Sequence, residues 1–249
     1  MHSGLRLQVR SLMMIPPTFS SPQTLPELLH SRAQDPHSSA KVAFVGADGH
    51  VTSHISLAEL YRDSTQYARR LLAAGLSSVD IVLASFPDHE HHIRLFWACC
   101  LAGIPVCPLP APHPDKSRQK LLLDHLQKLF HQPTLVAHTD TIRAVHQLAP
   151  DLKALELQKI SDLACDTSRG VYPARIAAPT DLVCLMLTSG STGNSKAVQL
   201  SHSNILSSVR GKIQHHDTSS SSRFFNWIAF DHVACLSEIH IHAIEANAR

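Results

Sequence analysis

Residues 181–200 read Asp-Leu-Val-Cys-Leu-Met-Leu-Thr-Ser-Gly-Ser-Thr-Gly-Asn-Ser-Lys-Ala-Val-Gln-Leu. The run from Asp181 to Leu187 is apolar after its first residue and has the length of a strand, which is typical of a strand buried on both faces. The polar segment that follows holds two of the nine glycines in the 249-residue chain and ends at Lys196. The stretch therefore predicts a buried strand that ends in a glycine-rich and hydroxyl-rich loop.

The composition of this loop suits a phosphate group. Gly190 and Gly193 tolerate positive φ and allow close backbone approach, so several N–H groups can converge on one anion. Lys196 adds a compact cation. The hydroxyl groups that can donate to phosphate oxygens belong to Thr188, Ser189, Ser191 and Thr192. We therefore predict that the loop binds the phosphates of a nucleotide.

Two other interpretations of the loop are weaker. Clusters of Ser, Thr and Gly are usually surface turns, but here a buried strand precedes the cluster and a lysine follows it. The Walker pattern G-x-x-x-x-G-K-[ST] does not fit, because a second glycine stands between Gly190 and Lys196 and Ala197 follows the lysine. A P-loop kinase or GTPase is therefore not expected.

The loop resembles the T-S-G-S-T-G-x-P-K-G phosphate loop of adenylate-forming enzymes. This family includes acyl-CoA ligases, luciferases and the adenylation domains of nonribosomal peptide synthetases. The loop departs from the family pattern at Ser195, which replaces the usual proline, and at Ala197, which replaces the usual glycine. Its hydroxyl groups, both glycines and the lysine are kept.

The resemblance extends along the chain in both directions. Residues 101–109, Leu-Ala-Gly-Ile-Pro-Val-Cys-Pro-Leu, are similar to the family's K-A-G-x-x-x-x-P-L segment. Residues 225–234 and 238–243 most resemble fungal synthetase-like adenylation domains, and within these the domains that activate aromatic α-keto acids. The resemblance implies an α/β fold, the N-terminal part of a large adenylation domain, with mostly parallel sheets covered by helices.

The family's chemistry would then be the activation of a carboxylate. A carboxylate oxygen attacks the α-phosphate of ATP, pyrophosphate leaves and an acyl adenylate forms, with ATP and Mg²⁺ as the implied cofactors. The resemblance makes Lys196 the catalytic residue that steadies the pyrophosphate. It also implies that the loop residues from Thr188 to Gly193, together with Lys196, bind the nucleotide. The acyl group would pass to coenzyme A or to the phosphopantetheine arm of a carrier domain.

Asp231 and His232 are the candidate substrate-binding residues. In peptide-synthetase adenylation domains the aspartate of a similar F-D motif holds the substrate's amino group, whereas acyl-CoA ligases place a histidine beside the carboxylate. Phe230-Asp231-His232 matches each pattern in part. A third interpretation is that Asp231 only caps the following helix. The resemblance therefore implies an aromatic keto acid, an amino acid or another acyl acid as the substrate.

The rest of the chain alternates strand and helix signals, which favours parallel strands covered by helices. The expected strands lie at 41–45, 81–86, 105–108 and 134–137, and the expected helices at 57–75, 88–101, 116–130 and 141–148. Residues 1–23 are expected to be a disordered leader, with an organelle-import signal as the alternative. Residues 24–249 are expected to be the N-terminal part of the adenylation domain, without its C-terminal subdomain or a carrier domain.

Composition excludes some classes of function. The net charge of +2 with 17% charged residues gives no general basic surface for nucleic acid. No apolar run approaches the ~18 residues that a membrane helix needs, and we expect a cytoplasmic protein. The six cysteines lack C-x-x-C spacing and are expected to be small core residues.

The 19 histidines raise the question of a metal site. In residues 88–92, Asp-His-Glu-His-His, we expect Asp88 to cap a helix and the other side chains to face solvent. His240 and His242 are two residues apart and do not share a helical face. Neither cluster offers the four ligands of a closed zinc site, so no metal site is predicted.

Two alternatives to an enzyme stay open. The first alternative is a noncatalytic, truncated remnant of an adenylation domain. The second is an unrelated nucleotide-binding or metal-binding protein. A parallel sheet that stops partway would leave an open edge. We therefore expect weak or no adenylation by the isolated chain.

Overall fold

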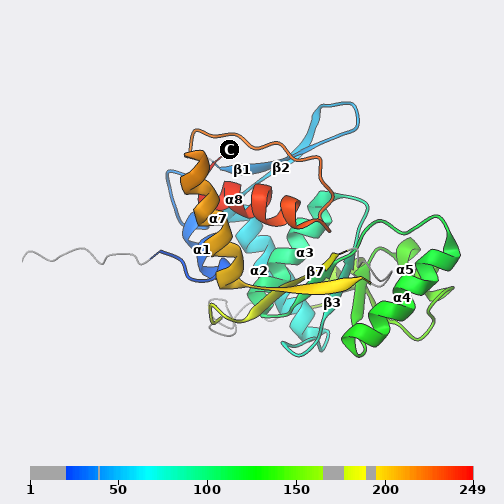
Figure 1. Cartoon of the computed structure of the whole chain (residues 1–249). Coiled ribbons are helices and arrows are strands. Elements are labelled where there is room, and N and C mark those ends of the chain that lie inside the picture. Colours follow the sequence, from blue (N-terminus) through cyan, green and yellow to red (C-terminus); the bar gives the residue numbers. More distant parts are fainter. Residues whose placement is uncertain (1–20, 39, 165–176, 189–194, 249) are drawn as a thin grey trace, which may run out of the picture.

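The computed structural model describes residues 21–38, 40–164, 177–188 and 195–248 (Figure 1). Most of the expected leader, 1–23, lies outside these residues. So do the loop residues Ser189, Gly190, Ser191, Thr192 and Gly193. Near the N-terminal end of the described residues, the carbonyl oxygen of Pro22 accepts a hydrogen bond from the Arg210 guanidinium.

A six-stranded sheet forms the centre of the molecule. Across the sheet its strands are β6 (Lys153–Glu156), β5 (Thr134–Ala137), β3 (Val82–Ser85), β4 (Val106–Pro108), β7 (Leu182–Thr188) and β8 (Lys196–Ser201). The first five are parallel, and β8 is antiparallel to β7. The expected α/β class with a mostly parallel sheet is confirmed.

Helices cover both faces of this sheet. The larger core holds residues of α1 (Leu25–Ala33), α2 (Leu57–Ala73), α3 (His89–Ala102), α6 (Leu157–Asp162), α7 (His202–His216), the π-helix η1 (Ala234–Ile241) and α8 (His242–Glu245). The smaller core holds residues of α4 (Lys116–Phe130) and α5 (Thr139–His146). Alternate residues of a strand enter different cores: Val82 and Ala84 the larger, Leu83 the smaller. The two groups of helices are separate in Figure 1.

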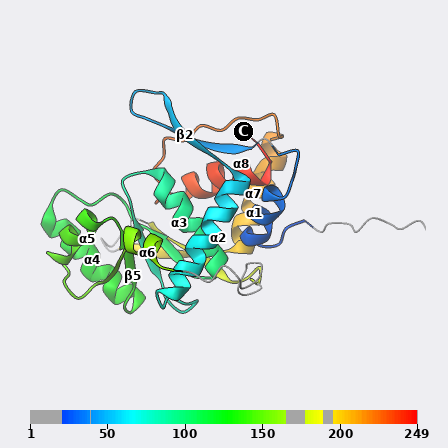
Figure 2. The same cartoon turned by 180° about the vertical axis from the view of Figure 1, so that it is seen from behind.

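A separate antiparallel pair, β1 (Lys41–Val45) and β2 (Val51–Ser56), precedes α2 and stands apart from the main sheet (Figure 2). The helix then begins with a capping box. The Ser56 hydroxyl oxygen accepts a hydrogen bond from the Glu59 N–H at 3.2 Å, and the Glu59 carboxylate accepts one from the Ser56 N–H at 2.9 Å. This pattern satisfies two backbone donors that the helix leaves open.

The expected strands and helices are all present, with their ends shifted by no more than a few residues. The sequence pattern did not predict α1, β2, β6, α6 or α8. It also did not foresee that residues 196–201 form a strand that runs back along β7. β6 is an edge strand of sequence Lys-Ala-Leu-Glu without a fully buried residue, so it lacks the apolar pattern that identifies a central strand.

Histidines take part in the larger core. His240 accepts a hydrogen bond from the Trp97 indole N–H at 2.9 Å, and His202 accepts one from the Leu25 backbone N–H at 3.2 Å. His92 is buried beside Phe86, so the expectation that it faces solvent is wrong. Burial lowers the pKa of His92 and of His202 to about 4 and that of His240 to about 3.

These values predict that acid destabilises the fold. An unfolded histidine has a pKa of about 6.5, so below that pH the unfolded chain takes up protons that the folded chain does not. The free energy of unfolding should therefore fall from pH 6.5 down to the folded pKa values of about 3 and 4. His240→Gln keeps an acceptor for Trp97 but does not titrate. Its loss of stability between pH 7 and pH 5, measured by urea unfolding, should be smaller than that of the wild type by roughly 2 kcal/mol.

His50 is exposed and serves as the matched control. His50→Gln should lose as much stability between the two pH values as the wild type. An equal loss in His240→Gln and wild type would show that His240 does not contribute.

Candidate functional site

The β7–β8 hairpin holds the two ends of the predicted phosphate loop. Thr188 is paired with Lys196 across the ladder, and the Thr188 hydroxyl donates to the Lys196 carbonyl at 3.4 Å. Both residues are exposed. The structure therefore brings together the first and last predicted nucleotide-binding residues, while those between them lie outside the described chain.

His125 of α4 fixes the exit of this loop. Its Nε2 lies 2.7 Å from the Ser195 carbonyl oxygen. A carbonyl only accepts, so Nε2 carries the hydrogen. The two residues are 70 positions apart in the sequence. No sequence signal links them, so His125 could not be predicted from the sequence.

Asp231 and His232 lie just before η1 but do not cap it. The N-cap of η1 is Val233, and no side chain makes a capping hydrogen bond there. The structure thus does not support the interpretation that Asp231 only caps the helix. Among the described residues no hydrogen bond or ion pair engages the Asp231 carboxylate, and His232 is exposed. Both side chains are free to meet a ligand.

The charge of Asp231 acts on two buried cysteines. Burial, with the Asp231 charge in the same direction, raises the pKa of Cys107 to about 12. Burial also raises the pKa of Cys235 to about 11, and again Asp231 adds to the effect. Cys107 belongs to β4, which is the neighbour of β7 in the sheet. Both thiols are therefore close enough to Asp231 to respond to its charge.

The five cysteines within the described chain are all buried and free. Burial raises the pKa of Cys99, Cys100 and Cys184 as well, so these thiols stay protonated at neutral pH. The expectation that they are core residues is confirmed for these five, and Cys165 lies outside the described residues.

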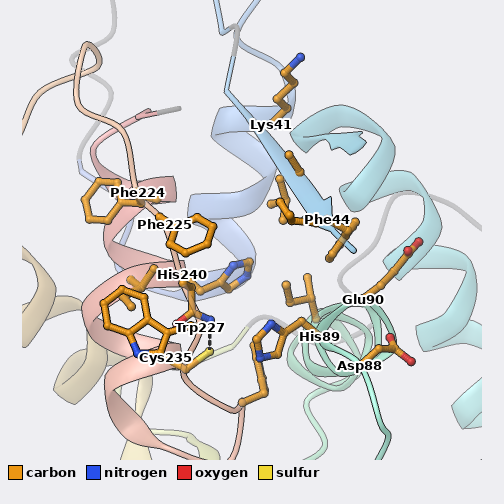
Figure 3. Close-up of a pocket in the computed structure, with 18 of the residues that line it drawn as sticks. Lys41, Phe44, Asp88, His89, Glu90, Phe224, Phe225, Trp227, Cys235 and His240 are labelled. Carbon is orange, nitrogen blue, oxygen red and sulfur yellow. Dashed lines mark hydrogen bonds between the residues drawn. The ribbon is translucent and has the colours of Figure 1, made fainter. Parts of the chain in front are cut away.

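An apolar cavity of about 690 Å³ opens between β1, the start of α3, residues 224–227 and η1 (Figure 3). Phe225 and Trp227 on its wall are 66% and 76% exposed. Phe230, next to Asp231, also lines it. Lys196, Asp231 and His232 do not line this cavity.

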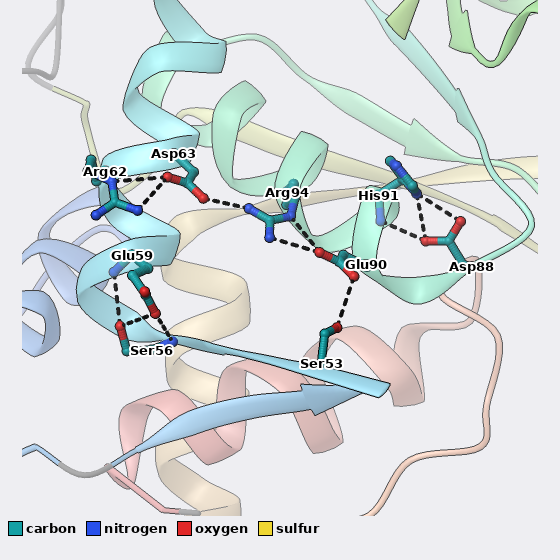
Figure 4. Close-up of polar contacts among 9 residues, drawn as sticks. All are labelled: Ser53, Ser56, Glu59, Arg62, Asp63, Asp88, Glu90, His91 and Arg94. Carbon is teal, nitrogen blue, oxygen red and sulfur yellow. Dashed lines mark hydrogen bonds and ion pairs between the residues drawn. The ribbon is translucent and has the colours of Figure 1, made fainter. Parts of the chain in front are cut away.

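A network of ion pairs holds the first turns of α3 against α2 (Figure 4). Arg94 contacts Asp63 of α2 at 2.7 Å and Glu90 of its own helix at 2.8 Å. Glu90 also accepts a hydrogen bond from the Ser53 hydroxyl at 3.4 Å. Although burial acts in the opposite direction, these carboxylates raise the pKa of Arg94. The network fixes the position of the helix start.

Comparison with known proteins places this arrangement among known folds. The family model described as "AMP-binding enzyme" matches residues 31–245. Microperfuranone synthase of Emericella nidulans is 36% identical over 201 residues, which cover 78% of this chain and 21% of that protein. An inactive atromentin synthetase of Paxillus involutus is 32% identical over 227 residues, which cover 89% of this chain and 23% of the relative. The chain thus spans about a fifth of the length of these curated relatives.

Solved structures share the fold. The adenylation domain of a keto acid-selecting NRPS module, bound to keto acyl adenylate, matches with a TM-score of 0.79 and 25% identity over 92% of this chain and 41% of that one. McyG A-PCP complexed with phenylalanyl-adenylate matches with a TM-score of 0.81 and 23% identity over 90% of this chain and 35% of that one. Across the described ranges, we find no helix with the length and apolar character needed to cross a membrane.

The ion-pair network predicts that replacing Arg94 lowers the free energy of unfolding more than replacing Arg62. Arg94→Met leaves Asp63 and Glu90 half-buried without their shared cation, so the free energy of unfolding should fall by roughly 2 kcal/mol. Arg62 also contacts Asp63, but its side chain is 62% exposed. Arg62→Met should therefore change stability by less than about 1 kcal/mol. Urea unfolding of both variants checks this, and equal losses would contradict it.

Proposed function

Because the chain belongs to the AMP-binding enzyme family, we propose that it supplies the phosphate-binding part of an adenylation domain. That domain would use ATP to activate a carboxylic acid as an acyl adenylate for transfer to a thiol. The observation that carries the proposal is the pairing of Thr188 with Lys196 at the open end of the β7–β8 hairpin. The paired strands hold the ends of a loop rich in glycine and hydroxyl groups.

The free state of Lys196 supports this role. Its side chain is exposed, and it forms no ion pair with any carboxylate of the described residues. The ammonium group of Lys196 follows a loop whose sequence is rich in possible N–H and hydroxyl donors. Such a group can stabilise the negative charge that pyrophosphate gains as it leaves. His125 contributes by anchoring Ser195 and so the start of the strand that carries the lysine.

Mg²⁺ accompanies ATP in this chemistry and neutralises charge on the phosphates. It keeps several waters and binds proteins through one or two carboxylates together with the substrate's phosphates. At the open end of the hairpin, the Thr188 hydroxyl is an oxygen atom that could bind a metal ion. Among the described residues, no carboxylate forms a hydrogen bond with this hydroxyl. We therefore assign no step of the reaction to a metal held by this part of the chain.

Asp231 and His232 are the residues that we propose to meet the acid substrate. The Asp231 carboxylate suits an ammonium group, whereas the His232 imidazole suits a carboxylate or keto oxygen. An aromatic keto acid is the first choice of substrate, because the similar NRPS module is described as keto acid-selecting. An amino acid or another acyl acid is the alternative, and phenylalanyl adenylate is bound by the McyG protein.

Two thiol acceptors suit the proposed reaction. A carrier domain with a phosphopantetheine arm fits the synthetase relatives, and coenzyme A is the alternative. We place the reaction in the cytoplasm. A noncatalytic role is a second candidate, since relatives at 32% and 30% identity are inactive atromentin synthetases.

The proposal predicts that ATP binding depends on Lys196. Calorimetry with ATP and Mg²⁺ should show binding by the wild type and at least a tenfold weaker affinity in Lys196→Ala, because the variant loses its charged contact with phosphate. Lys128 is exposed at the end of α4 and gives the matched control, Lys128→Ala, which should bind as the wild type does.

ATP–pyrophosphate exchange with aromatic keto acids and amino acids then separates an enzyme from a noncatalytic relative. It should be run on this chain and on a form extended by any in-frame downstream coding sequence. Equal ATP affinity in wild type and Lys196→Ala, or no binding by either form, would contradict the proposed function.

A further inference from the structure

The pairing of β3 with β5 brings two distant segments to one edge of the sheet. Ser85 and Ala137 are the last paired residues of the two parallel strands, so Phe86 and His138 follow side by side. After β3 the chain passes through α3 to β4, on one side of this strand pair. After β5 it passes through α5 to β6, on the other side. Ligands of open α/β sheets bind at such divergence points, outside the carboxyl ends of the strands.

Three side chains of types that can bind metal ions meet at this point. Asp88 and His91 come from the start of α3, and His138 from the start of α5. One ligand atom from each of the three lies within 4.8 Å of the others. The imidazole rings of His91 and His138 are 4.6 Å apart between centroids and cross at 85°. Both Asp88 carboxylate oxygens lie 2.8 Å from the Nδ1 of His91 (Figure 4).

Helix capping explains only part of this cluster. Asp88 is the N-cap of α3 and accepts a hydrogen bond from the His91 N–H at 2.9 Å. His138 is the N-cap residue of α5, but its side chain makes no capping hydrogen bond. The start of α5 therefore does not account for the position of the His138 ring beside the other two ligands.

A buried phenylalanine supports both imidazoles. Phe86 is 6% exposed, and its ring stacks on His91 at 5.6 Å and meets the edge of His138 at 5.3 Å. Packing of this kind limits the positions that the two rings can take before an ion arrives. The side chains of His91 and Asp88 are 38% and 42% exposed, so an ion and a water ligand can reach the cluster.

The donor types select the class of ion. Two imidazoles and one carboxylate are ligands for zinc, which in open sites takes three protein ligands and a water. Mg²⁺ and Ca²⁺ prefer oxygen ligands, so the two histidines disfavour them.

The helix N-termini carry partial positive charge, which the Asp88 carboxylate offsets. Burial acts to raise the pKa of Asp88, but the hydrogen bonds from the His91 N–H and ring outweigh it and lower the pKa.

We propose that Asp88, His91 and His138 bind a divalent transition-metal ion, with Zn²⁺ as the ion of choice. The three residues follow β3 and β5, whereas the predicted nucleotide loop follows β7. The ligand atoms move inward to distances of about 2.0–2.2 Å from the ion, and a water completes the coordination. The proposal does not depend on the proposed function.

Two substitutions remove ligands while leaving the fold in place. Asp88→Asn keeps the helix cap, because asparagine caps as well as aspartate, but removes the charged ligand. His138→Gln replaces a half-buried ring by a polar side chain. His216 pairs with His215 on α7, at 4.9 Å between ring centroids, and gives the matched control His216→Ala. Circular dichroism checks that each variant is folded.

Calorimetry with Zn²⁺ alone should show one ion per chain, bound at least tenfold more weakly by Asp88→Asn and by His138→Gln but unchanged in His216→Ala. Co²⁺ should give the visible absorption of a four-coordinate ion in the wild type, and this absorption should be lost in both ligand variants. Zn²⁺ binding that is absent from the wild type, or equally strong in the wild type and both ligand variants, would overturn the proposal.

Discussion

The parallel pairing of β3 with both β4 and β5 is the constraint on which the rest of the structure depends. All four residues of β3 are buried, and alternate side chains enter the two cores on opposite faces of the sheet. A strand in this position must be apolar throughout, because neither face meets water. Its carboxyl end also fixes where α3 begins, and α3 carries the buried Trp97 that the π-helix packs against.

The β7–β8 hairpin lies at one edge of the main sheet. β7 is buried along its middle, but it ends in an exposed residue, and β8 returns antiparallel beside it. The ladder pairing of Thr188 with Lys196 therefore fixes the two ends of the predicted phosphate loop. His125 adds a contact from α4, so the smaller core also helps to position this loop.

Two groups of histidines among the described residues differ in their burial. His202 and His240 are enclosed, and as neutral rings they accept hydrogen bonds that join elements distant in sequence. His91 and His138 remain partly open to solvent and lie beside a carboxylate. A buried histidine thus stays neutral and accepts a hydrogen bond in the interior. A histidine that solvent can reach and that lies beside a carboxylate can bind a metal ion, as we propose for His91 and His138.

The sequence by itself determined the α/β class, most strands and helices, and the glycine and hydroxyl loop with its lysine, because periodicity and turn chemistry are local properties. It could not place residues that meet only through folding. The antiparallel return of β8, the contact of His125 with Ser195, and the arrival of His138 at Asp88 and His91 were decided by the tertiary structure. Strand order brings these groups together, and strand order depends on packing between segments far apart in the chain.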